Sequence, residues 1–426
     1  MNPPSSGRPS VKRPGKAALL LLLAGTGLYF LANIQRVAIP GALFDTLQSE
    51  LAVSASWITG LGAAFMYVYA LSQLATGFLV ERFGGRRVIL AGAFLFSVGV
   101  LLFPLSHTLP LFYLSRVLAG CGASALYLSL VAEARRTVRE SRFPLVLSVI
   151  IFTGYSGGIA AGAPFVIGAE TLGWRILLLL LAAVGFLCWL VFGVACVLDR
   201  DRSESGRNDT RFSFRPFVEL LRRRNNRAVC LCAGLHFGLY YVLQTVLGKK
   251  YLEDFLELSP TTAGWVLSLM AILAALSGFV PVTARRLTGG RIRLFIIGAG
   301  CMSVFVCGGL TLMTGLGVRS PAVAALLCLL AVTASLSPIM IPLLYWTNAP
   351  ERAGLAVSLF NFSLYFFVAL LGNAAGLLLG CFEPQLRGTS LVYGQGAWTA
   401  IFAGLFICAL LVLRFALRVS EKTDKR

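Results

Sequence analysis

Twelve long apolar runs divide this chain of 426 residues, and each is long enough to cross a lipid bilayer. A spanning helix needs about 20 mostly apolar residues, whereas a membrane β-strand needs only about 10 residues of alternating character. The runs here are continuous, so in lipid only helices can satisfy their backbone polar groups. The chain is therefore predicted to be an all-α membrane protein with twelve transmembrane helices. We place them at residues 17–39, 53–80, 88–106, 110–133, 144–168, 174–198, 228–252, 262–284, 294–316, 321–346, 353–380 and 397–418.

Charged residues are scarce and unevenly distributed. They make up 13% of the chain, and hydrophobic residues make up 57%. With the N-terminus in the cytoplasm, thirty of the 37 lysines and arginines fall on the cytoplasmic side, as is typical of multi-pass proteins. The net charge of +19 thus indicates topology and contact with membrane lipids, and we expect no nucleic-acid partner. We predict a monomer in a bacterial cytoplasmic (inner) membrane, with both termini cytoplasmic.

A charged segment separates six apolar runs from six. This organisation predicts a disordered cytoplasmic tail at 1–16, a six-helix bundle at 17–198 and a cytoplasmic linker at 199–227. A second six-helix bundle at 228–419 and a short cytoplasmic tail at 420–426 follow. Both fifth helices carry glycines every fourth residue, which would let neighbouring backbones approach closely. These helix-packing glycines are Gly154, Gly158 and Gly162 in the first half and Gly372, Gly376 and Gly380 in the second.

The stretch "GFLVERFGGRR" follows the second run and concentrates charge between glycines. Its gating residues are predicted to be Gly77, Glu81, Arg82, Gly84, Arg86 and Arg87. Gly77 permits a tight helix crossing, and Gly84 permits a sharp turn. The acid and the arginines can form an ion cluster that closes one side of the protein in one conformation. We interpret the stretch as a gate latch.

Twelve helices in a six-plus-six arrangement, together with this stretch, resemble the major facilitator superfamily. Further matching features are Tyr69 and Gln73 before the stretch, "GWR" at 173–175 and "PERAGLAVSLFNF" from residue 350. Arg116-x-x-x-Gly120-x-Gly122 resembles the second signature of the family. The family usually has Asp where Glu81 stands. The resemblance implies two pseudo-symmetric bundles that transport a small molecule by alternating access.

The resemblance also implies that helices 1, 4, 7 and 10 line a central cavity. Helix 7 offers two polar stripes there, His236-Tyr240-Gln244 and Tyr241-Thr245-Lys249. Cations without obvious acidic partners favour an anionic ligand, because an unpaired charge in the membrane costs several kcal/mol. We hypothesise that a small organic anion, such as a nutrient carboxylate, is the substrate. Its predicted binding residues are Tyr29, Asn33, Arg36, Arg116, Tyr240 and Gln244. Snorkelling remains the alternative for Arg36 and Lys249, and a structural or coupling role for Arg116.

Energy coupling is predicted to be secondary, because the chain has no phosphate-binding loop of the Gly-x-x-x-x-Gly-Lys-Ser/Thr type. Candidates for proton coupling are Glu133 and His236, although Glu133 could pair with Arg135 or Arg136 and His236 could be a hydrogen-bonded helix residue. We expect no cofactor, no metal and no enzymatic activity. Two alternatives stay open, a proton-driven exporter of drugs or metabolites and a non-transporting membrane receptor. The direction of transport, and proton symport against exchange, are also open.

Overall fold

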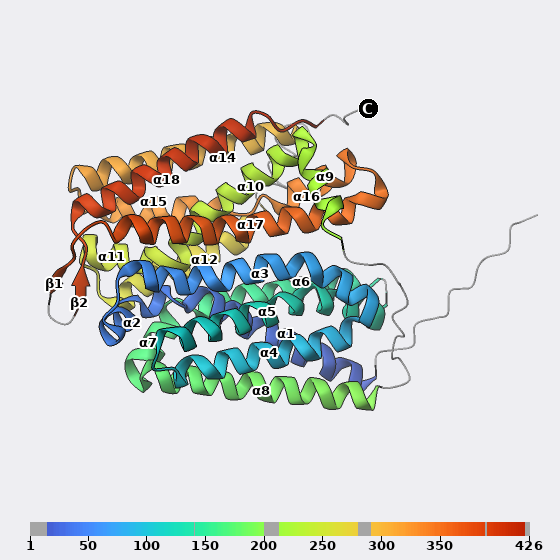
Figure 1. The fold of residues 1–426 in the computed structure, drawn as a ribbon. Coiled ribbons are helices and arrows are strands. Elements are labelled where there is room, and N and C mark those ends of the chain that lie inside the picture. Colours follow the sequence, from blue (N-terminus) through green and yellow to red (C-terminus); the bar gives the residue numbers. More distant parts are fainter. Residues whose placement is uncertain (1–14, 140, 200–212, 280–290, 388–389, 422–426) are drawn as a thin grey trace, which may run out of the picture.

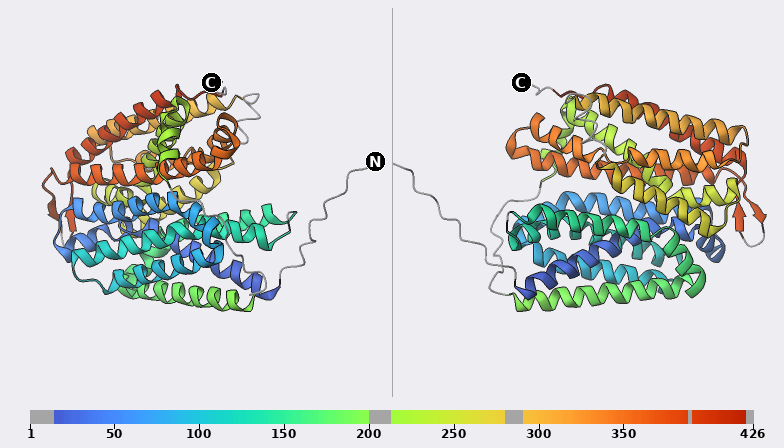
Figure 2. Two further views of the ribbon diagram at one scale, coloured as in Figure 1. Left: turned by 45° about the vertical axis from the view of Figure 1, so that its right-hand side comes forward. Right: turned by 180° about the vertical axis from the view of Figure 1, so that it is seen from behind.

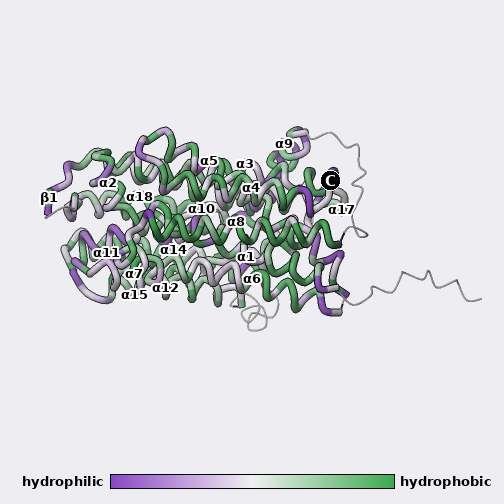
Figure 3. The backbone as a smooth tube through the Cα atoms, turned by 90° about the horizontal axis from the view of Figure 1, so that it is seen from below, coloured by the Kyte–Doolittle hydropathy of each residue, from purple (hydrophilic) through white to green (hydrophobic). Residues whose placement is uncertain are grey.

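The computed structural model describes residues 15–139, 141–199, 213–279, 291–387 and 390–421. Most of the predicted tails at 1–16 and 420–426, and residues 200–212 of the predicted linker at 199–227, lie outside these residues. Among the described residues, twelve helices are long and apolar enough to cross a membrane, which confirms the predicted fold class. Figure 3 shows hydrophobic residues gathered in a central band, with hydrophilic ones more frequent at the two ends.

The helices form two halves, which Figure 1 shows one above the other. The first half comprises α1 (Lys16–Ala38), α3 (Ala55–Phe83), α4 (Gly85–Leu105), α5 (Leu109–Thr137), α6 (Phe143–Ala160), α7 (Ala163–Leu172) and α8 (Trp174–Leu198). The second comprises α10 (Arg224–Val242), the π-helical turn η3 (Leu243–Leu247), α11 (Gly248–Leu256), α12 (Pro260–Ser277), α14 (Ile292–Gly315), α15 (Pro321–Val332), α16 (Ser337–Thr347), α17 (Pro350–Leu379) and α18 (Gln395–Ala416).

Five short elements extend the bundle. Between α1 and α3 lie the turn η1 (Gly41–Leu43) and the helix α2 (Phe44–Leu51), and α9 (Arg215–Arg222) precedes α10. An antiparallel hairpin of β1 (Gln385–Arg387) and β2 (Ser390–Val392) connects α17 to α18, with Leu386 opposite Leu391. We call the end that carries α2 and the hairpin the hairpin end. The opposite end, where α1 begins and α9 lies, is the linker end (Figure 1).

Two predicted spans are interrupted, which corrects their continuous assignment. The fifth breaks between α6 and α7, and the tenth between α15 and α16. Pro164 and Pro338 stand in the first turns of α7 and α16, where a proline without an N–H is tolerated but cannot continue a preceding helix. The seventh span is longer than predicted, because α10, η3 and α11 run on continuously from Arg224 to Leu256.

Burial separates central helices from peripheral ones. In the apolar stretch of the seventh span, 89% of the residues are buried, whereas in that of α8 only 22% are buried. The seventh span therefore lies at the centre of the molecule, and α8 lies at the edge with its apolar surface available to lipid. A central position makes polar residues on α10 and α11 candidates for function.

Glycines set the spacing of the helices inside the first half. A side chain at Gly122 of α5 would meet backbone atoms of Gly92 and Phe96 on α4, and one at Gly120 would meet the carbonyl of Phe65 on α3. The three helices thus touch backbone to backbone, as expected where small residues line a membrane helix interface.

We predict that Gly122→Leu destabilises the folded protein by about 1–3 kcal/mol, because α4 and α5 would have to move apart. Gly404→Leu in α18 is the matched control, since nothing lies within 4 Å of a side chain placed there. Thermal unfolding of the purified proteins in detergent measures the difference. Equal melting temperatures for the two variants would contradict the close packing of α4 against α5.

Candidate functional site

Arg36 is a buried cation in the last turn of α1, with only 8% of its surface exposed. One guanidinium nitrogen donates to the Tyr365 hydroxyl at 3.2 Å, and another donates to Asn33 Oδ1. Its Nε–H is buried and has no hydrogen-bond acceptor. No carboxylate of the described residues forms an ion pair with Arg36. The charge is thus held by neutral groups alone.

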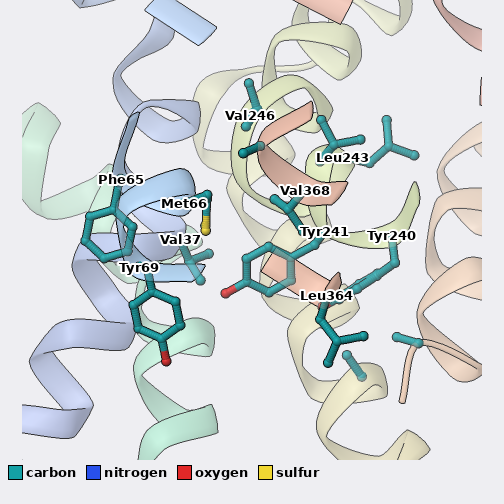
Figure 4. Packing of buried hydrophobic residues seen from close by; sticks show 14 of the residues in the cluster. Val37, Phe65, Met66, Tyr69, Tyr240, Tyr241, Leu243, Val246, Leu364 and Val368 are labelled. Atoms are coloured by element: carbon teal, nitrogen blue, oxygen red, sulfur yellow. The ribbon is translucent and has the colours of Figure 1, made fainter. Parts of the chain in front are cut away.

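Aromatic rings from three other helices surround this guanidinium. Its central carbon lies 5.4 Å from the ring centroid of Tyr69, 5.7 Å from that of Tyr241 and 5.2 Å from that of Tyr365. Tyr69 belongs to α3, and the other two belong to α10 and α17 of the second half. Figure 4 shows Tyr69 and Tyr241 on facing helices. Such cation–π contacts offset only part of the cost of desolvating the Arg36 charge.

Further tyrosines extend the same cluster. Tyr29 packs against Tyr127 of α5, with ring centroids 5.3 Å apart. Tyr155 of α6 lies within electrostatic reach of Arg36, Tyr127 and Tyr365, yet 44% of its surface is exposed. Tyr155 is therefore the exposed member of this group of tyrosines. Tyr29, Asn33 and Arg36 thus meet as the helical spacing predicts, whereas sequence reasoning did not assign Tyr69, Tyr241 and Tyr365 to the site.

Arg116 is placed differently from the predicted ligand contact. It is 1% exposed, and its nitrogens donate to the backbone carbonyls of Leu61, Gln35 and Ile39 at 3.3, 3.2 and 2.9 Å. Two of these carbonyls belong to the C-terminal end of α1, where helix carbonyls lack partners within the helix. The Phe65 ring covers the guanidinium at 4.4 Å. Arg116 thus caps α1 and joins it to α3 and α5, which matches the alternative structural role.

The predicted stripe on helix 7 also needs correction. The Gln244 side chain donates to the Leu267 carbonyl on α12 at 3.0 Å, and Tyr240 packs beside Tyr241. Tyr241, from the neighbouring stripe, is the residue against Arg36. Adjacent stripes differ by only about 100° around a helix, so spacing alone could not choose between them. Lys249 is not an unpaired cation, because its Nζ lies 2.6 Å from Glu253 one turn later.

The two proton-coupling candidates are both hydrogen-bonded. Glu133 accepts from Arg86 at 2.8 Å, from Arg136 at 3.2 Å and from Thr137 at 3.3 Å. His236 is buried, with Nδ1 at 2.8 Å from the Ser303 hydroxyl and Nε2 at 2.7 Å from the Thr333 carbonyl. That carbonyl lies at the break between α15 and α16, where the α-helical ladder leaves it free.

The ion cluster of the predicted latch is centred on Arg86, which also donates to the Asp199 carboxylate at 2.5 Å. Its partners Glu133 and Asp199 lie on α5 and after α8, so the cluster ties together helices of the first half only. Gly84 makes the sharp turn into α4, with φ of 81°. Glu81, Arg82 and Arg87 are exposed. Nothing lies within 4 Å of a side chain built at Gly77, so no tight crossing occurs there in this conformation.

The predicted glycine ladders contribute unequally to packing. A side chain at Gly154 would collide with Tyr29, and one at Gly162 or Gly376 would collide with Ser268 or Thr59 across the two halves. Gly158, Gly372 and Gly380 would meet only ordinary contacts. Alternate positions of a ladder thus make the close approaches, because helix partners cross at an angle rather than running parallel.

Contacts between the halves are tightest toward the hairpin end. A side chain at Gly41 would lie 2.5 Å from the carbonyl oxygen of Thr245, and one at Gly264 would lie 3.0 Å from the backbone of Ala163. Near the linker end, Gly77 and Gly354 have open space around them. Figure 2 shows the ribbons of the two halves spreading apart toward that end. The described conformation is therefore closed at the hairpin end.

No group of three or more His, Cys, Asp or Glu residues within the described ranges is arranged to hold a metal ion. The chemistry available around Arg36 is thus that of one guanidinium, several phenols and the side-chain amide of Asn33.

Comparisons with known proteins agree with this architecture. A crystal structure of the peptide transporter POT in complex with sulfate superposes with a TM-score of 0.73 at 14% identity, covering 97% of this chain and 96% of that chain. The human voltage-gated purine nucleotide uniporter is 24% identical over 388 residues, or 84% of this chain and 83% of the relative. Multidrug resistance protein 2 of Bacillus subtilis is 29% identical over 154 residues, covering 34% of this chain and 36% of the relative. The family model described as Major Facilitator Superfamily matches residues 21–373, and the chain therefore belongs to that superfamily.

Proposed function

We propose that this chain is a secondary transporter of a small organic monoanion, in which Arg36 binds the carboxylate of the solute. The observation that carries the proposal is the buried Arg36 charge, whose Nε–H has no acceptor and which no carboxylate of the described residues pairs. A guanidinium can hold a carboxylate at two points, so an entering anion would supply both the missing charge and the missing acceptor.

The charge balance of the site favours a single negative charge on the solute. Arg36 is the cation against which Tyr69, Tyr241 and Tyr365 pack, and Arg116 is committed to backbone carbonyls. A dianion bound there would keep one charge uncompensated in a low-dielectric setting, which costs several kcal/mol. The human relative is named for purine nucleotides. Those solutes carry several charges, so the substrate proposed here differs from them.

Transport is proposed to proceed by alternating access, with the linker end in the cytoplasm. Close contact between the halves at the hairpin end, and open space at Gly77 and Gly354, support an inward-open state. The ring centroids of Tyr69 in the first half and Tyr365 in the second lie 4.6 Å apart beside Arg36. A solute bound at the junction of the halves can be released to either side when the halves rock. The ion cluster around Arg86 is then proposed to keep the first half rigid during the motion.

The alternative function, export of drugs, is supported by one relative named for multidrug resistance, which aligns over about a third of the chain. An exporter of lipophilic cations needs an acid near its solute, whereas the described site presents a cation. The anion proposal is therefore preferred.

His236 is proposed as the proton-coupling residue, rather than Glu133. The Ser303 hydroxyl also donates to the Ala299 carbonyl at 3.1 Å. With its hydrogen used there, Ser303 can accept from Nδ1 while Nε2 donates to Thr333, so a doubly protonated ring fits. When the hydroxyl turns toward Nδ1, the neutral ring fits as well. The pocket can thus hold either protonation state with its hydrogen bonds made.

We expect Arg36→Gln to lower uptake of monocarboxylates by roughly 100-fold at low solute concentration, because about 3 kcal/mol of charge-assisted hydrogen bonding is lost. Arg36→Lys keeps the charge without the planar fork, so its uptake should lie between that of the wild type and that of Arg36→Gln. Arg414→Gln, an exposed arginine of α18, is the control. Flux into proteoliposomes over a panel of monocarboxylates, dicarboxylates and lipophilic cations measures this. Unchanged uptake of every anion by Arg36→Gln would refute the anion site.

We expect replacement of the two buried arginines to have different effects on thermal stability. Arg36→Leu is expected to leave the melting temperature unchanged or higher, because it removes a charge without an acidic partner. Arg116→Leu leaves three carbonyls without their donor, which costs about 2–4 kcal/mol. Thermal unfolding of each purified variant without added solute tests this. If Arg36→Leu destabilised the protein as much as Arg116→Leu, Arg36 would be a structural residue rather than a binding residue.

His236→Gln is expected to remove the dependence of anion uptake on an imposed pH gradient, while exchange of labelled for unlabelled anion without a gradient persists. The amide can hydrogen-bond but cannot carry the proton. Glu133→Gln is the comparison variant and should keep the gradient dependence. Loss of that dependence in Glu133→Gln alone would assign proton coupling to Glu133 instead.

A further inference from the structure

A buried lysine lies at the hairpin end, further along helix 7 than the Arg36 site. Lys250, in the first turn of α11, is fully buried. Its Nζ donates to Asp254 Oδ1 at 2.7 Å and to the Leu391 carbonyl at 2.5 Å. It also forms an ion pair with Asp45 Oδ1 at 2.6 Å. Two acids and a carbonyl therefore share one ammonium group.

These three partners come from different halves of the protein. Asp254 lies one turn later on α11, and Leu391 lies in β2, so both belong to the second half. Asp45 lies in the first turn of α2, in the first half. The contact with Asp45 is therefore the one that crosses between the halves. This contact is an ion pair without hydrogen-bond geometry, because no donor is aligned with Asp45 Oδ1.

The hairpin holds the Lys250 group in place from the second half. The Tyr393 backbone N–H donates to Asp254 Oδ2 at 3.0 Å, and Arg387 donates to Glu257 at the end of α11. Hydrogen bonds from Arg387 and Arg319 lower the pKa of Glu257 from its usual value, so the carboxylate stays charged and the hairpin stays tied to helix 7. The hairpin thus moves with the second half.

The first half reaches this group through one face of α2. Asp45 contacts Lys250, and Gln48, three residues later, donates to the Tyr393 hydroxyl at 3.0 Å. Residues three apart lie on the same side of a helix, so α2 presents a charged and a neutral contact together. Other polar contacts also cross here, since Thr261 donates to Glu170 at 3.1 Å and the Ala163 N–H donates to the Ser268 hydroxyl at 3.0 Å. Among the described residues, however, the ion pair of Asp45 with Lys250 is the one that joins the two halves.

We propose that Lys250 is a gating residue of the transport cycle, which exchanges Asp45 for water each time the hairpin end opens. An ammonium stripped of every acid in this setting would cost several kcal/mol. Asp254 and the Leu391 carbonyl stay with Lys250 when the halves separate, so its charge remains neutralised. Asp45 is already 21% exposed and stands in the first turn of α2, where the helix dipole stabilises an acid. The ion pair can therefore break at low cost.

The neighbouring lysine supplies a matched comparison. Lys249 also pairs with an acid four residues later, and its side chain is also buried, at 7% exposure. Its partner Glu253 lies on the same helix, so this pair does not connect the halves. Loss of Lys249 removes an ion pair within one helix, whereas loss of Lys250 also removes the ion pair between the halves.

The test is hydrogen–deuterium exchange of the intact purified protein, compared among wild type, Asp45→Asn, Lys250→Gln and Lys249→Gln. Asp45→Asn should speed amide exchange in residues 44–51 roughly tenfold, because the hairpin end opens more often. Exchange in residues 76–84, at the linker end, should slow in the same variant, because the two ends open alternately. Asp45→Glu should restore both rates, and Lys249→Gln should change neither.

Asp45→Asn keeps the pair of Lys250 with Asp254, so it stays informative even if Lys250→Gln fails to fold. Faster exchange at both ends would identify a merely structural contact and overturn the proposal. Exchange in residues 44–51 equal to wild type, or an equal effect of Lys249→Gln, would overturn it as well. The measurement needs no solute, so its outcome is independent of the proposed anion substrate.

Discussion

A charge inside a membrane protein must be neutralised by a partner, because hydrocarbon and packed protein solvate it poorly. This chain meets that requirement in four different ways. Arg86 pairs with acids of its own half, and Arg116 uses the free carbonyls at the end of α1. Lys250 shares acids from both halves, and Arg36 has only aromatic rings, a hydroxyl and an amide. The manner of neutralisation separates the scaffold from the proposed gate and the proposed binding site.

The four arrangements also divide the molecule by how readily each part can change. Contacts of Arg86 and Arg116 join helices within one half, so they favour motion of that half as a rigid body. The Lys250 contact with Asp45 crosses between the halves beside glycines that bring backbones together. Arg36 lies where Tyr69 and Tyr365 of opposite halves meet. The proposed binding and gating residues thus both lie at the junction, about which the halves are proposed to rock.

Much of the fold could be predicted from local signals. Apolar runs predicted the twelve spans, and i, i+4, i+7 spacing correctly grouped Tyr29, Asn33 and Arg36 on one stripe. Breaks in the fifth and tenth spans were missed, although Pro164 and Pro338 signalled them. The lysine pairs of α11 also had a readable signal, since Glu253 and Asp254 stand four residues after Lys249 and Lys250. Tyr365 had no such signal in the sequence, because its contact with Arg36 depends on how α17 crosses α1.

By itself, then, the sequence determined that the chain lies in a membrane, forms helices in a six-plus-six order and carries cations within its spans. Composition and periodicity decide these properties, because they depend on neighbours within a few turns of one helix. Only the tertiary structure decided which partners each cation has. Arg116 and Arg36 look alike as arginines in apolar helices, and their partners come from residues up to 329 positions away. Contacts between helices, which no local pattern encodes, commit Arg116 to backbone carbonyls and place Arg36 among neutral side chains.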